Sequence, residues 1–594
     1  MSEYHAPIED MQFVLHNVAG LDQILELDEF QGMDRELITA ILDESSKFSS
    51  NVLDPLNKVG DEHGSICENS EVTTPPGWKE AYRQFVDGGW NGLSFDVERG
   101  GQGLPWLVAT AVQEMWHSSN MSFGLCPLLT QGAIRALELH GSKEQQERYL
   151  ERLITGEWTG TMNLTESQAG SDLAAIRTRA VAENGYYRIK GQKIFITYGE
   201  HDLTENIIHF VLARCSDSPA GVRGISMFIV PKFLVNEDGS LGERNDLRCV
   251  SLEHKLGIHA SPTAVMSYGD NGGAIGYLVG EKNRGLEYMF TMMNLARHAV
   301  GVEGLAVAER AYQHAIDYAR QRVQGTAIGT RERVAIVEHP DVRRMLMTMK
   351  SLIDGMRCLA YFTAGVFDLS IKHPDEIARQ NYGELQALLI PLVKGWCAES
   401  GNEVAYIGVQ IHGGMGFIEE TGAAQYLRDV RITPIYEGTT GIQANDLIGR
   451  KILRGDREAL ERLVENIRQS ISQNDQEDEA VALISTAVQT ALNHFNRATD
   501  WVYQTGETHP QVSAAASVGY MNVFALTVAG WLMLDMASVA AAELRAGSGH
   551  TEHLQEKLIS AKYFATHILP RAQANADAVI QSSSVALELA ESQF

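Results

Sequence analysis

A chain of 594 residues exceeds the size at which one hydrophobic core stops growing, about 250–300 residues, so several domains are expected. Its formal net charge is −27, from 49 Lys and Arg against 76 Asp and Glu. This acidic balance argues against nucleic acid as a partner, because binding a phosphate backbone requires a basic face.

The cysteines and the N-terminal residues indicate the cellular compartment to expect for the protein. The 6 cysteines are widely spaced and form no C-x-x-C pair, so neither a disulfide framework nor a zinc site is predicted. Residues 1–10 are acidic and lack an apolar core, which matches neither a secretory signal nor an Arg-rich transit peptide. The prediction is a cytoplasmic protein with reduced thiols.

Residues 1–157 are predicted to form an N-terminal helical domain. Apolar residues recur at helical spacing in 34–43 and again in 131–140. Prolines and glycines between residues 75 and 103 divide the helices into short pieces.

Residues 158–280 have the character of a β domain. Asn184-Gly185 separates two β-rich runs and predicts a hairpin, and the runs 207–213 and 224–230 continue the pattern. A small antiparallel barrel or sandwich is expected.

The helical period returns in residues 281–455, where long amphipathic runs predict a helical bundle. A polar stretch at 474–479 is typical of a linker, and the Ala-rich remainder predicts an extra C-terminal helical domain over 456–594. The expected fold class is therefore α+β, in the order helical, β, helical and additional helical.

One apolar stretch, Val512 to Leu534, carries no charge and is long enough to span a bilayer. Its many small residues favour a helix packed on all sides by other helices. A membrane span and a peripheral membrane contact remain as alternatives.

Several catalytic patterns are missing from the sequence. It has no G-x-G-x-x-G after a strand, no G-x-x-x-x-G-K-[ST], no G-x-S-x-G and no H-E-x-x-H. Its 19 histidines show no ligand spacing. A doubly wound nucleotide fold, an ATPase, a hydrolase and a metal site all lose their main support.

Four separated segments carry the chemistry. They are Met162-Asn-Leu-Thr-Glu-Ser-Gln-Ala-Gly-Ser-Asp172; Gly191-Gln-Lys-Ile-Phe-Ile-Thr197; Asn294-Leu-Ala-Arg297 with Tyr318-Ala-Arg-Gln-Arg322; and Gln410-Ile-His-Gly-Gly414 with Ile435-Tyr-Glu437-Gly-Thr-Thr440. Strand alternation places Phe195 and Thr197 on one face. Each segment alone has an ordinary reading as a turn, a packed strand or a solvated helix.

Together, in order and at these spacings, the four segments resemble the acyl-CoA dehydrogenase family over roughly residues 30–455. The resemblance implies an FAD-dependent oxidation of the Cα–Cβ bond of an acyl-CoA to a trans-2-enoyl-CoA, with hydride passing to flavin N5. The FAD-binding residues that it implies are Met162, Leu164, Thr165, Ser171, Phe195, Thr197, Arg322, Gln410, Gly414 and Thr439.

The resemblance assigns the catalytic base to Glu437. Some relatives carry the base on the helix of the third segment, where this chain has Ala296, which cannot accept a proton. The substrate residues that the resemblance implies are Ser171, Asn294, Arg297 and Gly438. A carboxylate with the ordinary pKa of about 4.3 is a weak base for an α-proton, so burial must raise its pKa.

The length beyond residue 455 is similar to that of the larger family members, which include very-long-chain acyl-CoA dehydrogenases and the bacterial 3-methylmercaptopropionyl-CoA dehydrogenases. These are typically homodimers, and the expected electron acceptor is an electron-transfer flavoprotein. An acyl-CoA oxidase using O2 and a non-enzymatic nucleic-acid-binding relative are the alternatives. No motif determines the acyl group.

Overall fold

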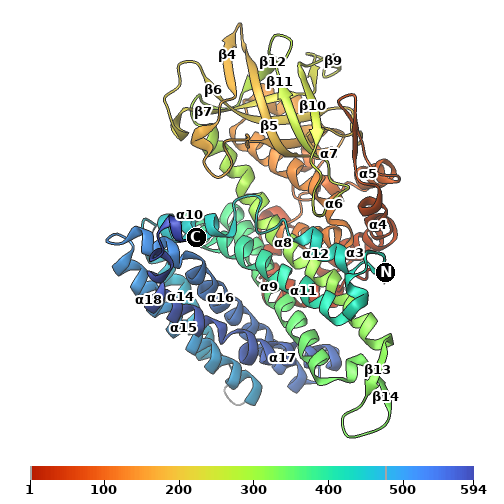
Figure 1. Ribbon diagram of the computed structural model, residues 1–594, viewed down its shortest axis with the longest axis vertical. Helices are drawn as coiled ribbons and strands as arrows, with labels where there is room; N and C mark the ends of the chain where they lie inside the picture. Colours follow the sequence, from red (N-terminus) through yellow and green to blue (C-terminus); the bar gives the residue numbers. More distant parts are fainter. Residues whose placement is uncertain (1–2, 456, 475–477) are drawn as a thin grey trace. The chain divides into compact units, whose positions relative to one another are not determined.

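The computed structural model describes residues 3–455, 457–474 and 478–594. Backbone contacts divide the described residues into two compact units. Unit 1 takes in 1–46, 105–118 and 297–594, and unit 2 takes in 47–104 and 119–296. The chain changes unit at 46/47, 104/105, 118/119 and 296/297, and the last two changes fall within the long helices α6 (Trp106–His140) and α8 (Gly285–Gln321) (Figure 1).

Unit 2 begins with helices and a short hairpin. The helices that lie wholly within it are α4 (Asp54–His63), α5 (Trp78–Asp87) and α7 (Lys143–Thr155). Between α4 and α5, strands β1 (Ile66–Glu68) and β2 (Glu71–Thr73) pair across Asn69 and Ser70, whose φ angles of 53° and 68° are left-handed. Both turn residues therefore have the conformation of a type I′ hairpin, although Asn-Ser is a weaker sequence signal than Asn-Gly.

A β-barrel forms the rest of unit 2 (Figure 1). Its strands are β3 (Thr159–Asn163), β4 (Arg179–Glu183), β5 (Tyr186–Thr197), β6 (Ile207–Cys215), β7 (Ile225–Pro231), β10 (Leu247–Leu252), β11 (Thr263–Tyr268) and β12 (Ala274–Leu278). Strand β4 pairs with both β5 and β6, and β12 and β7 complete the ring between them. Strands β8 (Phe233–Val235) and β9 (Leu241–Arg244) form a separate hairpin.

The predicted hairpin at Asn184-Gly185 is confirmed, because β4 pairs with β5 in the register Glu183↔Tyr186 and Gly185 has a φ of 92°. Most strand pairs are antiparallel, as expected. The pairs β3/β6 and β4/β6 are parallel, because the intervening chain is long enough for a crossover connection that a tight turn cannot make. Buried Ile189, Val211 and Phe228 belong to the apolar cluster that these strands enclose.

Unit 1 is a large helical assembly. Its helices, apart from the shared α6 and α8, are α1 (Ile8–Asn17), α2 (Leu21–Leu25), α3 (Arg35–Phe48, which ends in unit 2), α9 (Pro340–Lys372), α10 (Glu376–Leu392), α11 (Ala398–His412), α12 (Ala423–Val430), α13 (Thr440–Asp446), α14 (Arg457–Gln473), α15 (Glu479–Thr505), α16 (Pro510–Ala546), α17 (Thr551–Tyr563) and α18 (Arg571–Ser582). A hairpin of β13 (Val323–Thr326) and β14 (Arg333–Ala335) follows α8. The α+β fold class predicted from sequence is confirmed.

Helix α16 contains the uncharged stretch 512–534. Among the described residues it is the one helix long and apolar enough to cross a membrane, yet most of the side chains in that stretch are buried inside unit 1. It packs against α9, α15, α17 and α18. The predicted helix surrounded by other helices is therefore what the structure shows.

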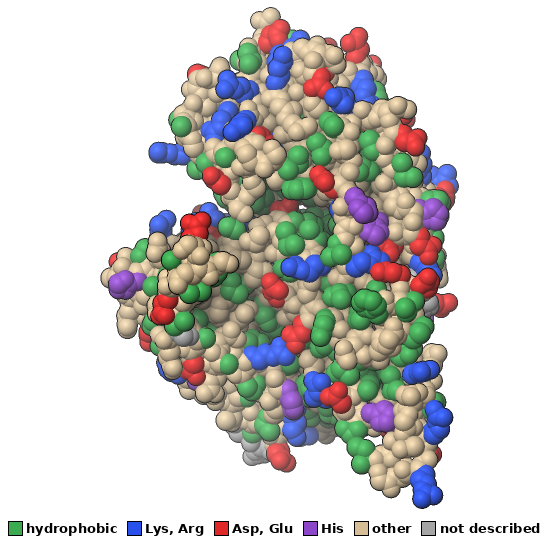
Figure 2. Space-filling model, in the orientation of Figure 1, with side chains coloured by type: hydrophobic (Ala, Val, Ile, Leu, Met, Phe, Trp, Pro, Cys, Tyr) green, Lys and Arg blue, Asp and Glu red, His purple; other side chains and the backbone are tan. Residues whose placement is uncertain are grey.

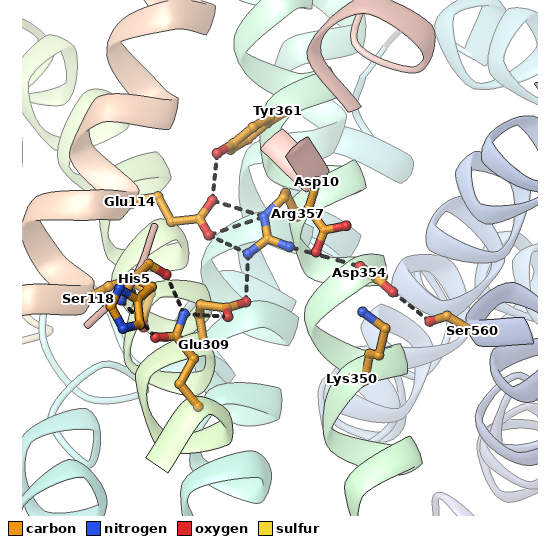
Figure 3. A network of polar contacts seen from close by, with 12 residues as sticks. His5, Asp10, Glu114, Ser118, Glu309, Lys350, Asp354, Arg357, Tyr361 and Ser560 are labelled. Carbon is orange, nitrogen blue, oxygen red and sulfur yellow. Dashed lines mark hydrogen bonds and ion pairs between the residues drawn. The ribbon is translucent and has the colours of Figure 1, made fainter. Parts of the chain in front are cut away.

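A buried network of charged side chains connects the C-terminal helices to the rest of unit 1 (Figure 3). The guanidinium of Arg357 on α9 donates to Glu114 Oε1 of α6 at 2.6 Å and to Glu309 Oε2 of α8 at 2.8 Å. One turn earlier on α9, Asp354 accepts from Lys557 Nζ of α17 at 2.8 Å. Because a buried charge is stable only when it is paired, these contacts hold the four helices in one arrangement.

Helices α8 and α11 approach each other through glycines. A Cβ atom on Gly304 would lie 2.5 Å from the backbone oxygen of Cys397, and one on Gly401 would lie 2.4 Å from the backbone oxygen of Gly304. Only glycine permits backbones to pack this closely. The contact brings the buried face of α8 against the π-helical segment η8 (Val393–Cys397), which precedes α11.

Candidate active site

The predicted base, Glu437, lies in the loop that joins α12 to α13. Its φ of 55° is left-handed, which is costly for a residue with a Cβ atom and requires support from the surroundings. That support includes the bond from Thr440 N to Pro434 O at 3.0 Å and the bond from Thr440 Oγ1 to Glu399 Oε1 at 2.6 Å. Strained backbone held in this way is typical of functional sites.

Two buried side chains bind the backbone carbonyl of Glu437. Gln443 Nε2 donates to it at 3.1 Å, and Arg297 Nε donates to it at 3.4 Å. Gly438, with a φ of 89°, passes so close to Gln443 that a Cβ atom there would lie 2.7 Å from Nε2. The structure thus brings together three predicted residues, Glu437, Gly438 and Arg297, in unit 1.

The electrostatics of Glu437 suit a base. Burial raises the pKa of the Glu437 carboxyl, whereas the nearby cations Arg297 and Lys394 oppose that rise. Desolvation makes the carboxylate more basic, and the two cations favour its ionised form. Glu437 is therefore a stronger base than an exposed carboxylate, with two positive charges beside it.

Three further residues lie beside this base, although the sequence motifs assign them no role. Glu303 on α8 and Lys394 in η8 are fully buried, and Tyr436 donates a hydrogen bond from its hydroxyl to Glu303 Oε2. Lys394 Nζ donates to Thr433 O at 2.7 Å. Their signal in the sequence was a lone charge within an apolar helical run, in 299–308 for Glu303 and in 388–397 for Lys394.

The flavin-signature residues lie in unit 2, where the loop after β3 is joined to β5. Ile194 N donates to Thr165 O at 2.9 Å, Lys193 Nζ donates to Leu164 O at 2.9 Å, and Thr161 Oγ1 donates to Thr197 O at 2.7 Å. The structure therefore brings Leu164 and Thr165 beside Thr197 and its neighbours. Met162 is a buried residue of β3, and Ser171 is exposed in the following loop.

Glu166 anchors this loop and was also missed, although it stands inside the signature. Its Oε1 accepts from Lys193 Nζ at 2.8 Å and from Thr178 Oγ1 at 2.6 Å, and its Oε2 accepts from Arg177 N at 2.6 Å. Burial raises the pKa of Glu166, but Lys193 and the hydrogen bonds outweigh it and lower this pKa to about 2. Glu166 is therefore a carboxylate that fixes the shape of the loop.

Phe195 lies in a β-bulge of β5. The pairing with β11 shifts between Met266↔Lys193 and Ala264↔Ile196, and Phe195 has a φ of 59°. Strand alternation alone did not predict this bulge. Phe195 is 58% exposed, which is unusual for a large aromatic residue within a strand. A bulge that re-aims one aromatic ring is suited to covering a flat ligand.

The remaining predicted residues lie at other places. Thr439 caps α13 by accepting from Ile442 N at 3.3 Å. Asn294 is exposed on the part of α8 that belongs to unit 2. Arg322 follows α8, Gln410 lies at the end of α11, and Gly414 lies in the short helical segment η9 (Gly413–Phe417) that follows α11. The ends of α8 and α11 meet, since the rings of Tyr318 and His412 stack with centroids 4.5 Å apart.

Sequence comparison gives the family. In chain order, residues 39–157 match the family described as acyl-CoA dehydrogenase, N-terminal domain, 161–270 its middle domain and 283–453 its C-terminal domain, and 463–590 match acetyl-CoA dehydrogenase C-terminal like. The chain is 49% identical to the 3-methylmercaptopropionyl-CoA dehydrogenase of Ruegeria pomeroyi, over 95% of this chain and 96% of that protein.

Two further matches cover the whole length. A butyryl-CoA dehydrogenase of Syntrophomonas wolfei is 33% identical over 100% of this chain and 99% of its own. An acyl-CoA dehydrogenase of Bacillus anthracis, solved in complex with FAD, has the same fold, with a TM-score of 0.75 at 21% identity over 98% of this chain and 93% of that one.

Fold and sequence together define a flavoprotein oxidoreductase that acts on CH–CH bonds. The chain belongs to the acyl-CoA dehydrogenase family, whose cofactor is FAD. The family resemblance inferred from the four segments, including the resemblance to the C-terminally extended members, is confirmed.

Proposed function

We propose that this protein oxidises a short acyl-CoA to its trans-2-enoyl-CoA, with Glu437 removing the α-proton. The observation that carries the proposal is the setting of Glu437. Its backbone is strained, burial raises the pKa of its carboxyl, and the charges of Arg297 and Lys394 oppose that rise. An α-proton beside a thioester is a weak acid, so it needs both a raised base pKa and stabilisation of the charge that develops.

The turn at Glu437 offers that stabilisation. Its amide N–H donates no hydrogen bond to any residue that the structure describes, so it can donate to the thioester oxygen as negative charge grows there. Arg297, held against the Glu437 carbonyl, adds positive charge to the same region. Preorganised donors of this kind act without reorganising during the reaction.

The residues of unit 2 fit the family cofactor. Phe195 presents an exposed ring on the bulge, Thr197 ends the same strand, and the loop at Thr165 is bonded to the residue before Phe195, since Ile194 N donates to Thr165 O. An aromatic face with polar groups at its edge matches an isoalloxazine ring. When FAD is bound, it supplies the acceptor for the hydride that leaves Cβ.

A short acyl group is proposed because two relatives that match nearly the whole chain are named as dehydrogenases of 3-methylmercaptopropionyl-CoA and of butyryl-CoA. The test is a panel of acyl-CoAs from about C3 to C18, together with the methylthio-propionyl ester, compared by kcat/KM. A preference for the longest esters would contradict the proposed substrate class.

The proposed electron acceptor is an electron-transfer flavoprotein. The alternative is an oxidase that passes electrons to O2. Reduction of a purified electron-transfer flavoprotein, measured beside release of hydrogen peroxide, separates the two. Rapid peroxide release with no flavoprotein reduction would favour the oxidase.

We also propose that the protein is a homodimer in the cytoplasm. Phe417 is 86% exposed in the segment after α11, and Met415 and Ile418 beside it are 48% and 45% exposed. Clustered apolar side chains at this level of exposure are typical of an interface. Phe417→Ser should lower the mass observed by light scattering, whereas a monomeric wild-type protein would contradict the proposal.

The decisive experiment for the reaction is Glu437→Gln, which retains size and hydrogen bonding but accepts no proton. We expect FAD content and acyl-CoA binding to persist while anaerobic bleaching of the flavin by substrate slows by several orders of magnitude. Glu552→Gln, an exposed position on α17, is the matched control. Bleaching at the wild-type rate in Glu437→Gln would end the assignment.

A further inference from the structure

Glu303 is a buried acid that the proposed reaction does not use. It lies on α8 between Gly301 and Gly304, the two glycines at which this helix approaches η8 and α11. A Cβ atom on Gly301 would lie 2.6 Å from the backbone oxygen of Val393, the residue before Lys394. The close approach therefore carries the carboxylate of Glu303 into the region of Lys394, whose charge acts on it.

Among the described residues, only one of the two carboxylate oxygens of Glu303 has a hydrogen-bond partner. Oε2 accepts the hydroxyl of Tyr436, whereas Oε1 is buried without a hydrogen-bond partner among the described residues. A buried carboxylate oxygen with no donor is expensive, while a neutral carboxyl group in the same place costs much less. The geometry thus favours a proton on Glu303.

The charged and titratable groups around Glu303 and Lys394 come from several elements. Tyr436, Lys394 and Glu437 interact with Glu303, and Glu437, Arg297 and Glu399 interact with Lys394. Burial raises the pKa of Glu303 to about 8, against the hydrogen bond from Tyr436 and the charge of Lys394. Glu303 and Glu437 repel each other when both are ionised, so the ionisation of one opposes that of the other.

Tyr436 is the residue directly before the proposed base. We propose that Glu303 is a positioning residue for Glu437. It holds the loop that carries Glu437 through its hydrogen bond with Tyr436, and it does so as a neutral acid, which places no second negative charge beside the carboxylate of Glu437. This inference rests on the proposed role of Glu437. It adds an acid that lies outside the four segments that carry the family resemblance.

The sign of the electrostatic effect follows from the charges. While Glu303 holds its proton, the charges that act on Glu437 are those of Arg297 and Lys394, and both favour its ionised form. When Glu303 loses its proton at alkaline pH, the new negative charge raises the pKa of Glu437. The wild-type pH profile of the flavin bleaching rate should then contain two inflections. One comes from the titration of Glu437, and the second, near pH 8, comes from the titration of Glu303.

The first test needs no turnover. Infrared difference spectra of the FAD-bound enzyme, recorded without substrate across pH 6 to 10 (a range spanning roughly 2 units either side of the Glu303 pKa of about 8), should show a protonated carboxyl band that disappears with alkalisation. The band should be missing in Glu303→Gln. A spectrum of Glu303→Gln identical to that of the wild type would overturn the neutral acid.

The second test separates the effect of the Glu303–Tyr436 hydrogen bond from the effect of the charge on Glu303. Glu303→Gln is neutral and still accepts from Tyr436, so its bleaching rate at pH 7 should stay within about 3-fold of wild type, with an unchanged acid limb and no alkaline inflection. Glu303→Ala and Tyr436→Phe both lose the bond, and each should slow bleaching by about 10- to 100-fold with little change in KM. Flavin absorbance and Tm verify that each variant is folded.

Each outcome has a distinct meaning. A Glu303→Gln acid limb displaced to lower pH would show that Glu303 is charged at neutral pH, and wild-type rates in both Glu303→Ala and Tyr436→Phe would show that it positions nothing; either result overturns the inference. If Glu437→Gln instead retains wild-type bleaching, the proposed function fails, while the infrared band still decides whether Glu303 is a neutral acid.

Discussion

Gln443 Nε2 donates a hydrogen bond to the backbone carbonyl of Glu437 at 3.1 Å, from the buried face of α13, the helix that begins at Thr440. The bond crosses the turn at Gly438 and closes the loop onto α13. The side chain of Gln443 is therefore a brace for a residue in a left-handed conformation.

Removing that brace should loosen the base. In Gln443→Ala the carbonyl of Glu437 keeps only the longer bond from Arg297, and we expect a loss of kcat of about 10-fold or more with a smaller change in KM, since misplacement by about 1 Å costs up to 100-fold. Stopped-flow bleaching measures it. Gln504→Ala, on the exposed surface of α15, is the control, and equal rates in the two variants would contradict the brace.

The cation Lys394 should set the acid limb of the pH profile. Flavin bleaching requires ionised Glu437, so the rate should fall as pH drops through the raised pKa of that carboxyl. Lys394→Met removes a charge that favours the carboxylate, and the midpoint of the limb should therefore move to higher pH. Lys372→Met, near the end of α9, is the control. A midpoint moved to lower pH would refute this electrostatic role.

The close contact of α8 with α11 should not tolerate a methyl group. In Gly304→Ala the new Cβ meets the backbone oxygen of Cys397, which cannot rotate away, and we expect a loss of about 1–3 kcal/mol of stability. Gly383→Ala on α10 is the matched control because nothing lies within 4 Å of its Cβ position; it should gain about 0.4–1 kcal/mol. Thermal unfolding distinguishes the two, and equal Tm values would contradict the contact.

The buried network around Arg357 should be essential for stability. Arg357→Met leaves Glu114 and Glu309 buried without their common cation, which typically costs about 3–5 kcal/mol. Arg571→Met removes an exposed pair with Glu403, and pairs of that kind contribute about 0–1 kcal/mol. Denaturant midpoints compare the variants. Similar midpoints would show that the buried network contributes no more than a surface pair.

Glu166 should make the protein sensitive to acid. Its pKa is about 2 in the folded chain and about 4.3 when unfolded, so its contribution to stability is present above the unfolded value and is lost as pH falls toward 2. Glu166→Gln should flatten that part of the stability profile and release FAD more readily at neutral pH. Glu183→Gln, on the exposed hairpin, should alter neither. An unchanged acid profile in Glu166→Gln would contradict the role.

Much of the fold could be predicted from sequence because its signals are local. Asn184-Gly185 gave the hairpin between β4 and β5, and the uncharged run of α16 gave a helix enclosed by others. The hairpins β1–β2 and β13–β14 were missed inside regions expected to be helical. Their short strands lack an alternating pattern, and Asn69-Ser70 is a weak turn signal.

The sequence by itself determined the family, its cofactor and the choice of Glu437 as the candidate base, because residue types at fixed spacing carry that information wherever the helices pack. Only the tertiary structure decided the neighbours of Glu437. Glu303 and Lys394 are far from Glu437 in the sequence, and they reach the Tyr436-Glu437 segment because α8 approaches η8 and α11 closely at its glycines. Likewise, the bulge that turns Phe195 outward arises from pairing with β11, a partner that local alternation cannot specify.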